Sequence, residues 1–255
     1  MKKTILAAVI GVSISGAAQA DMLGFYVGAG IFNTEFSGDF QDEDASSFNV
    51  SVDLEDDLDI KDDTGKYVYI AFEHPVPIIP NIRLARTELE QTGTSAISKT
   101  FEFDGITFTE NAVVDSTIDL SHTDGTLYYE ILDNWVNLDL GITVRQFDGQ
   151  IKLEAVIDGQ LRTAEEDLDY PIPMLYGKAQ FDLPFSGLSA SVEGNWIGYS
   201  GNSFMDAVAK IGYEGSLGLG VEAGLRTISV ELDDQDDLSA SLDLSGPYIA
   251  ATFHF

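Results

Sequence analysis

The sequence predicts an all-β fold: a transmembrane antiparallel β-barrel of about ten strands, with both termini in the periplasm. Three observations lead to this prediction. The first 20 residues have the pattern of a secretory signal peptide. Apolar residues then alternate with other residues along many short segments, and the chain ends on such a segment. No run of about 20 apolar residues follows the signal, so we expect no helical membrane span.

The signal peptide is predicted over residues 1–20, MKKTILAAVIGVSISGAAQA. Lys2 and Lys3 give a positive start, an apolar stretch follows, and Ala18, Gln19 and Ala20 form a small-x-small cleavage site. Cleavage after Ala20 leaves residues 21–255 as the barrel. We therefore expect export through the periplasm and localisation in the outer membrane of a Gram-negative cell.

The composition is strongly acidic, with 43 Asp and Glu residues against 13 Lys and Arg and a net charge of −30. A surface of this charge repels phosphate groups, so we expect no nucleic-acid partner. The chain contains no cysteine, which excludes a disulfide framework. Hydrophobic residues still make up 44% of the chain, and they occur in alternation rather than in blocks.

Ten segments alternate with a period of two, which is the pattern of β-strands. In each, one face is apolar, and the other contains glycine, tyrosine and charged residues. The segment at 80–92 alternates less cleanly than the others. The ten segments cover residues 23–32, 67–72, 80–92, 126–132, 135–145, 174–183, 188–199, 204–213, 217–226 and 246–255.

The connections between these segments alternate in length. Long, acidic ones are predicted at 37–63, 92–113, 148–168 and 232–238, and short ones at 75–79, 133–134, 184–187 and 215–216. One link, near residue 201, is short where a long one is due. Short turns on one side and long extracellular loops on the other are typical of outer-membrane barrels. An even number of strands returns both termini to the periplasm.

The second face of the strands distinguishes a barrel from a soluble β-sandwich, which also alternates. A sandwich presents a water-exposed face, whereas here glycine and tyrosine accompany charges of both signs. In a narrow lumen, close opposite charges satisfy one another. Arg83 and Glu214 are assigned to the same face. The predicted lumen charge network consists of Glu73, Glu130, Asp139, Arg145, Lys178, Asp182, Glu193, Asp206, Lys210, Glu222 and Arg226.

The last segment, GPYIAATFHF, places Phe253 and Phe255 on its apolar face. It resembles the C-terminal strand of outer-membrane β-barrel proteins, which ends in an aromatic residue that the barrel assembly machinery recognises. Residues 128–149 and 173–184 also resemble a family of uncharacterised Gram-negative outer-membrane proteins. The resemblance implies an assembly signal at Phe253 and Phe255, an outer-membrane location and a barrel architecture, but little about activity. The apolar face is expected to contact outer-membrane lipid, and the acidic loops are expected to meet cations and lipopolysaccharide.

Residues 39–63 contain eleven acidic residues and one lysine, and 165–169 and 231–237 are also acidic. Clustered carboxylates are the ligands that Ca²⁺ and Mg²⁺ prefer, so Asp56, Asp57 and Asp59 are candidate metal ligands. Their spacing is not that of an EF-hand, and a solvated acidic surface is the alternative. No other cofactor is expected. Lipopolysaccharide phosphates would approach these loops only through bridging divalent ions.

The second long connection contains FEFDGITF at 101–108, where Asp104-Gly105 is a strong hairpin signal. We therefore expect the third and fourth strands to continue beyond the membrane as a ribbon. Phe101, Phe103, Ile106 and Phe108 are expected to pack over the barrel mouth, with a grip on a partner as the alternative.

The sequence favours a structural or surface-interaction role. The alternative is a channel for small solutes or apolar ligands. A remote alternative is a hydrolase at His122, the one histidine of the three that is not placed at the periplasmic rim and that can face outward beside Ser121, Asp119 and Asp124. That stretch matches no motif of the outer-membrane proteases or lipid hydrolases, so enzyme activity is not expected. The oligomeric state stays open.

Overall fold

The computed structural model describes residues 23–42, 50–235 and 238–255. The predicted signal peptide and residues 43–49, part of the predicted acidic loop, lie outside the described residues. Every regular element within the described residues is a β-strand. Among them, no helix has the length and apolar character needed to cross a membrane.

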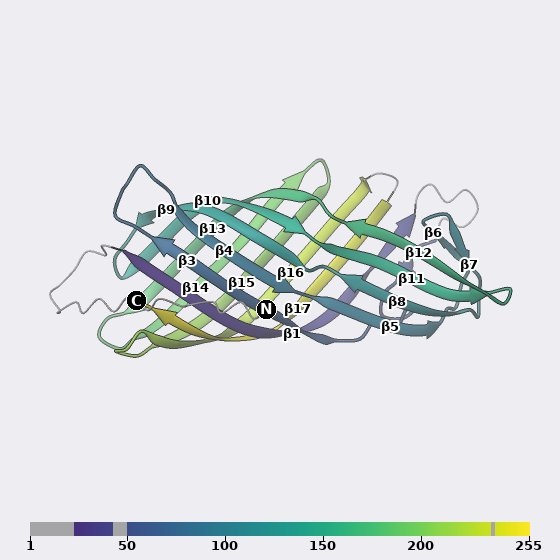
Figure 1. Ribbon diagram of the computed structural model, residues 1–255, viewed down its shortest axis with the longest axis horizontal. Coiled ribbons are helices and arrows are strands. Elements are labelled where there is room, and N and C mark those ends of the chain that lie inside the picture. Colours follow the sequence, from purple (N-terminus) through teal and green to yellow (C-terminus); the bar gives the residue numbers. More distant parts are fainter. Residues whose placement is uncertain (1–22, 43–49, 236–237) are drawn as a thin grey trace, which may run out of the picture.

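Ten strands close into an antiparallel barrel, as the sequence predicts. Consecutive strands pair with one another, and the last strand pairs back with the first (Figure 1). The barrel strands are β1 (Gly24–Asp42), β3 (Asp63–Glu73), β4 (Asn81–Glu88), β9 (His122–Leu132), β10 (Val136–Phe147), β13 (Pro171–Leu183), β14 (Leu188–Tyr199), β15 (Asn202–Glu214), β16 (Leu219–Gln235) and β17 (Leu238–His254).

The closure between β1 and β17 is long, from Tyr26 opposite His254 to Asp42 opposite Leu238. Beyond this ladder, Phe25 and Phe255 exchange two backbone hydrogen bonds of 2.9 and 3.0 Å. The first and last described strands therefore meet at one end of the barrel, which we call the terminal end. The compartment that this end faces stays a prediction.

Four barrel strands continue past the opposite end into a second sheet. This sheet contains β5 (Glu90–Ala96), β8 (Val113–Asp119), β11 (Gly149–Ile157) and β12 (Gln160–Leu168), in the order β12-β11-β8-β5. Beside it lie the hairpin of β6 (Phe101–Phe103) and β7 (Ile106–Phe108), and the short strand β2 (Val52–Asp53), which pairs with β1. We call residues 50–62, 89–121 and 148–170 the projection; its sheet and hairpin lie at the right in Figure 1.

The predicted long loops at 92–113 and 148–168 are therefore wrong as loops, because most of their residues form strands of the projection. Alternation continues through 151–157, and the chain then reverses at Asp158 and Gly159, whose φ angles of 53° and 75° suit a tight hairpin turn. Pairing of β5 with β8 confirms the predicted ribbon, which is widened by β11 and β12. The predicted loops at 37–63 and 232–238 are also shorter than expected, since β1 reaches Asp42 and β16 reaches Gln235.

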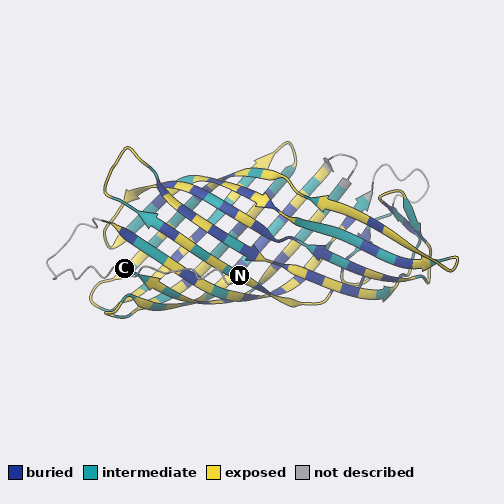
Figure 2. Cartoon of the chain, viewed as in Figure 1, coloured by how far each residue is buried: buried dark blue, intermediate teal, exposed yellow. Residues whose placement is uncertain are grey.

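Exposure alternates along the barrel strands, as Figure 2 shows. Outward apolar side chains such as Ile31, Ile142 and Leu225 are 49%, 58% and 66% exposed and form an apolar outer surface. The projection has an inner core instead, in which Phe40 packs against Phe101 and Phe103. The three predicted phenylalanines at 101, 103 and 108 are buried there, so they are not available to grip a partner.

Candidate functional site

The lumen of the barrel is lined by alternate residues of each strand, and small residues make room for large ones. On β10, Gly141 lies between Tyr128 of β9 and Tyr176 of β13. A Cβ atom at Gly141 would approach the Tyr128 Cβ to 2.7 Å and the Leu127 carbonyl oxygen to 2.3 Å. The glycine therefore allows two tyrosines to lean over the same strand.

The centre of the lumen contains a charged group that we call the Asp206 cluster: Asp124, Arg145, Asp206 and Arg226. Arg145 donates two hydrogen bonds of 2.8 Å to the Asp124 carboxylate and one of 2.7 Å to Asp206. Arg226 donates two further hydrogen bonds to Asp206, of 2.9 and 2.7 Å. Two cations and two carboxylates thus neutralise one another inside the barrel.

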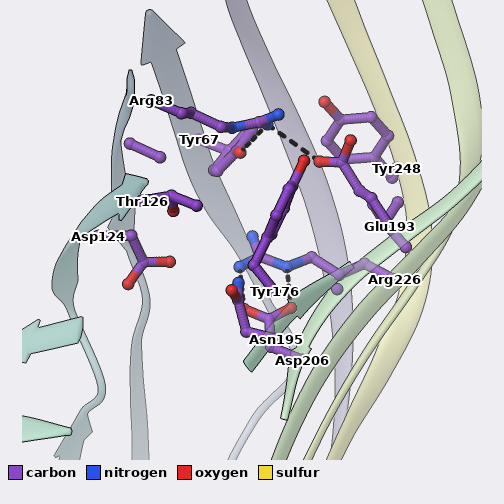
Figure 3. A pocket seen from close by; sticks show the side chains of 13 residues that line it. Tyr67, Arg83, Asp124, Thr126, Tyr176, Glu193, Asn195, Asp206, Arg226 and Tyr248 are labelled. Carbon is purple, nitrogen blue, oxygen red and sulfur yellow. Dashed lines mark hydrogen bonds and ion pairs between the residues drawn. The ribbon is translucent and has the colours of Figure 1, made fainter. Parts of the chain in front are cut away.

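A second group, the Glu193 cluster, lies nearer the terminal end and contains Arg83, Glu193, Lys210 and Glu222. Arg83 pairs with Glu193 at 3.0 Å, and Lys210 lies 3.4 Å from Glu193 and 2.9 Å from Glu222. The Arg83 guanidinium also lies over the Tyr69 ring, 4.2 Å from its centroid. A cavity of about 40 Å³ separates the two clusters, as Figure 3 shows for Arg83, Glu193, Asp206 and Arg226.

A larger cavity of about 350 Å³, which we call the vestibule, opens at the terminal end. Tyr26, Thr252 and His254 of the two terminal strands belong to its wall. Arg83, Tyr176 and Glu193 line both the vestibule and the inner cavity, so the Glu193 cluster forms the partition between them. The vestibule wall contains eight acidic side chains against three basic ones, which makes it strongly electronegative.

All eleven residues of the predicted lumen network lie in the lumen, but the structure divides them. Arg145, Asp206 and Arg226 belong to the Asp206 cluster, and Glu193, Lys210 and Glu222 to the Glu193 cluster. The remaining five line the vestibule, where the Lys178 ammonium lies 3.4 Å from the Asp139 carboxylate. The other three make hydrogen bonds to neutral partners: Glu73 with Tyr128, Glu130 with Asn81, and Asp182 with Asn137.

Sequence reasoning missed Asp124 as a member of the lumen network. It lies two residues before Thr126 and four before Tyr128, on the same face of β9, and both of those side chains are buried in the lumen. Strict period-two counting back from Tyr128 would have assigned Asp124 to the lumen. The sequence instead suggests Asp124 as a neighbour of His122 in the hydrolase alternative.

His122 does not face outward, as the remote hydrolase alternative would require. Its side chain is 1% exposed, its Nδ1 lies 2.7 Å from the Leu120 carbonyl oxygen, and its ring lies against Phe147. The alternation that places Asp124 in the lumen also turns His122 inward, since the two residues are two positions apart on one strand.

The three candidate metal ligands do not converge. Asp57 pairs with Lys99 at 2.6 Å, Asp59 pairs with Lys61, and the backbone N–H of Asp56 donates to the Asp53 carboxylate. No group of three or more His, Asp or Glu residues in the described ranges is arranged to hold a metal ion. The cation-binding expectation for this segment stays a prediction.

The predicted assembly signal lies on the outer surface at the terminal end. Phe253 and Phe255 are 38% and 64% exposed, and their ring centroids are 5.4 Å apart. Phe255 also stacks on Phe25 at 5.3 Å. The three rings form an exposed aromatic group where the barrel closes.

No protein-family model and no curated protein matches this chain. Among solved structures, it is similar to the CymD monoaromatic hydrocarbon channel, with 10% identity, 93% of this chain and 89% of that chain covered, and a TM-score of 0.33. It is also similar to the TodX monoaromatic hydrocarbon channel deltaS2 mutant, at 10% identity, 93% and 91% coverage and a TM-score of 0.34. The Pseudomonas putida toluene transporter TodX matches at 11% identity, 93% and 91% coverage and a TM-score of 0.28. These similarities are remote.

Proposed function

We propose that this chain is an integral outer-membrane barrel with a closed lumen, and that its role is structural or surface-interacting, carried by the acidic projection. The apolar outer surface supports a place in lipid, where a barrel leaves no backbone group unpaired. Its location in the outer membrane is also supported by the predicted signal peptide and by the aromatic residues at the closure.

The observation that carries this proposal is the filling of the lumen. Arg145 is fully buried in the Asp206 cluster, with its charge taken up by two carboxylates. Beyond that cluster, Phe36, Phe40 and Leu244 are exposed by 8% or less and belong to one continuous apolar core with the projection. A hydrated ion would have to cross both the ion pairs and the apolar core.

The projection gives the surface role its chemistry. Its outward residues include Asp115, Glu154 and Glu165, whereas its buried residues are mostly apolar, with a few polar exceptions such as Asp57 and Gln91. Such a surface meets the phosphates of lipopolysaccharide only through divalent cations, because like charges repel.

The test is a conductance record of the purified, refolded protein in a planar bilayer. We expect no steady current in symmetrical salt. A stable stepwise current would contradict a closed lumen.

Binding of purified lipopolysaccharide to the protein, measured with and without Mg²⁺ at matched ionic strength, tests the surface role. We expect Mg²⁺ to increase that binding, and equal binding in both conditions would contradict the bridging argument.

A second candidate function is a channel for small solutes or apolar ligands; CymD and TodX are described as monoaromatic hydrocarbon channels. The observation that favours it in this chain is the partition between the vestibule and the inner cavity. That partition consists of side chains, Arg83, Tyr176 and Glu193, rather than of a folded plug. Rearranging three side chains is a smaller movement than displacing a folded plug, so the partition is a candidate gate.

The same bilayer record tests this candidate with a variant. In a gated channel, the double substitution R83A/E193A removes the gate and raises the current above that of the wild type. In a lumen that is closed by the Asp206 cluster and the apolar core, the double variant stays as silent as the wild type.

A further inference from the structure

Two neighbouring rows of side chains form one wall of the vestibule, and both are centred on β10. In the first row, Gly141 lies between Tyr128 and Tyr176. In the second row, Asp139 lies between Glu130 of β9 and Lys178 of β13. An aromatic row therefore lies directly beside a charged one.

Asp139 has a carboxylate oxygen that nothing in the described chain satisfies. The residue is only 2% exposed, and its Oδ2 atom faces the Lys178 ammonium at 3.4 Å. Its Oδ1 atom is buried and has no hydrogen-bond partner among the described residues. Buried polar atoms of native proteins are nearly always paired, so this carboxylate oxygen at the cavity wall is incompletely compensated, and the positive charge of a ligand would stabilise it.

The vestibule also carries more negative charge than its own cations neutralise. The three basic side chains of its wall are already paired with carboxylates of the same wall: Arg83 with Glu193, Lys210 with Glu193 and Glu222, and Lys178 with Asp139. Glu214 lies 3.6 Å from His254. The other four acids of the wall form no ion pair with a basic side chain of the described residues: Glu73, Glu130, Asp133 and Asp182. The site therefore favours a cationic ligand.

The aromatic row indicates which kind of cation fits. The rings of Tyr128 and Tyr176 are 5.7 Å apart and inclined at 56°. Two other tyrosines of the vestibule already have cationic or imidazole partners, since Arg83 lies over Tyr69 and His254 stacks on Tyr26. Ring faces beside a carboxylate attract alkylammonium groups by cation–π contact. A metal ion requires converging oxygen ligands instead, and the described residues offer no such group.

We propose that the vestibule binds a small organic cation of the alkylammonium class. Its charged group lies against Asp139 and Glu130, and its alkyl groups lie against Tyr128 and Tyr176. The volume of about 350 Å³ is within the range of small-molecule sites. Ligand binding in the vestibule does not require an open lumen. The conductance experiment therefore tests the proposed function without testing this site.

The test is calorimetric titration of the full barrel in an uncharged maltoside detergent, with choline as the probe. The control ligand is 3,3-dimethylbutan-1-ol, which has the shape of choline without its charge. We expect saturable binding of choline and none of the alcohol. Equal heats from both ligands, or no saturable binding of choline, would overturn the proposal. Binding of Mg²⁺ that displaces choline at matched ionic strength would identify a metal site and would also overturn it.

Variants locate the site. D139N should weaken choline binding roughly tenfold, because it removes the buried charge and keeps the side-chain shape. Y128L should weaken binding by removing a ring, and Y128F, which keeps the ring, should rescue it. The matched control is D148N, at an aspartate that pairs with Arg86 and is 51% exposed at the junction with the projection. Each variant is checked for folding by its migration on a gel without boiling. Unchanged choline affinity in folded D139N would overturn the assignment.

Discussion

The Nη2 atom of Arg145 lies 2.7 Å from Oδ2 of Asp206, although the two side chains are only 0% and 7% exposed. The pair links β10 to β15 across the lumen, and Arg145 also binds Asp124 of β9. Strands that are far apart around the barrel wall are thus joined through its interior. Because both charges are removed from water, breaking this pair should cost more free energy of unfolding than breaking a surface ion pair.

We expect R145M to destabilise the barrel by about 3–5 kcal/mol, since it leaves Asp124 buried without its cation. Unfolding in urea from lipid vesicles, followed by the fluorescence of Trp135 and Trp196, measures the change. The matched control is E88Q, which breaks the exposed pair of Lys66 and Glu88, where the side chains are 69% and 55% exposed. That change should be below about 1 kcal/mol.

A double variant separates the buried charge from the lost packing. Adding D124N to R145M removes the carboxylate that the single variant leaves unpaired, so the double variant should be more stable than R145M alone. If R145M and E88Q change the free energy of unfolding equally, or if D124N lowers the stability of R145M further, this account of the Asp206 cluster is wrong.

Closure of β1 on β17 predicts heat-modifiable migration, in which the unboiled barrel runs faster on a gel than the boiled chain. The strands approach closely at Gly30, where a Cβ atom would lie 2.6 Å from the Ile249 carbonyl oxygen and 2.8 Å from the Ala250 Cβ. We therefore expect G30A to lower the temperature at which the fast band is lost. G125A is the control, because a Cβ atom there would have no neighbour closer than 3.9 Å. Identical migration with and without boiling would contradict a closed barrel.

The aromatic group at the closure predicts an assembly defect. Deletion of Phe255, or F255D, removes a ring that stacks on Phe25 and is 64% exposed on the outer surface. We expect less folded protein in outer-membrane fractions of cells that express the variant. H254A should matter less, because His254 points into the vestibule and stacks on Tyr26. Equal assembly of the three variants and the wild type would remove the predicted signal.

The barrel itself was predictable from the sequence because the lipid-facing residues follow one simple rule. Val68, Leu127 and Leu225 alternate with inward residues, and all three are exposed on the outer surface. The sequence also predicts the short link near residue 201, where Ser200 and Gly201 adopt the positive φ angles of a short hairpin turn.

The projection and the vestibule were harder to predict for physical reasons. Alternation in Val114, Ser116 and Ile118 continues that of the barrel, and nothing local marks where lipid ends and water begins. The vestibule arises from side chains of non-adjacent strands, such as Tyr26 and Tyr128, whose registers only the closed barrel sets. Alternation indicated which charged residues face inward, but not that they divide between two clusters and the vestibule wall.

The contact of Asp57 with Lys99 gives the last prediction, which concerns pH and calcium. Asp57 is 6% exposed, and its carboxylate accepts hydrogen bonds from the Asp53 backbone N–H at 2.9 Å and from Ser98 at 2.8 Å, in addition to its ion pair with Lys99 at 2.6 Å. Partial burial by itself raises the pKa of Asp57, but the hydrogen bonds and the Lys99 charge outweigh it and hold the pKa below its usual value.

A depressed carboxyl pKa stabilises the folded projection at any pH above the unfolded value of about 3.9, and this stability is lost as the pH falls through the folded pKa. D57N should therefore open the segment at 51–60 to proteolysis at pH 7, while the wild type and D57N should converge at the lowest pH. D56N is the matched control, because it keeps the ion pair between Asp57 and Lys99.

Since the Asp57 carboxylate is already paired with Lys99, we expect Ca²⁺ and Na⁺ at matched ionic strength to protect the segment at 51–60 from proteolysis equally. Greater protection by Ca²⁺ that D56N/D57N/D59N abolishes and D39N preserves would instead support the metal site predicted from the sequence.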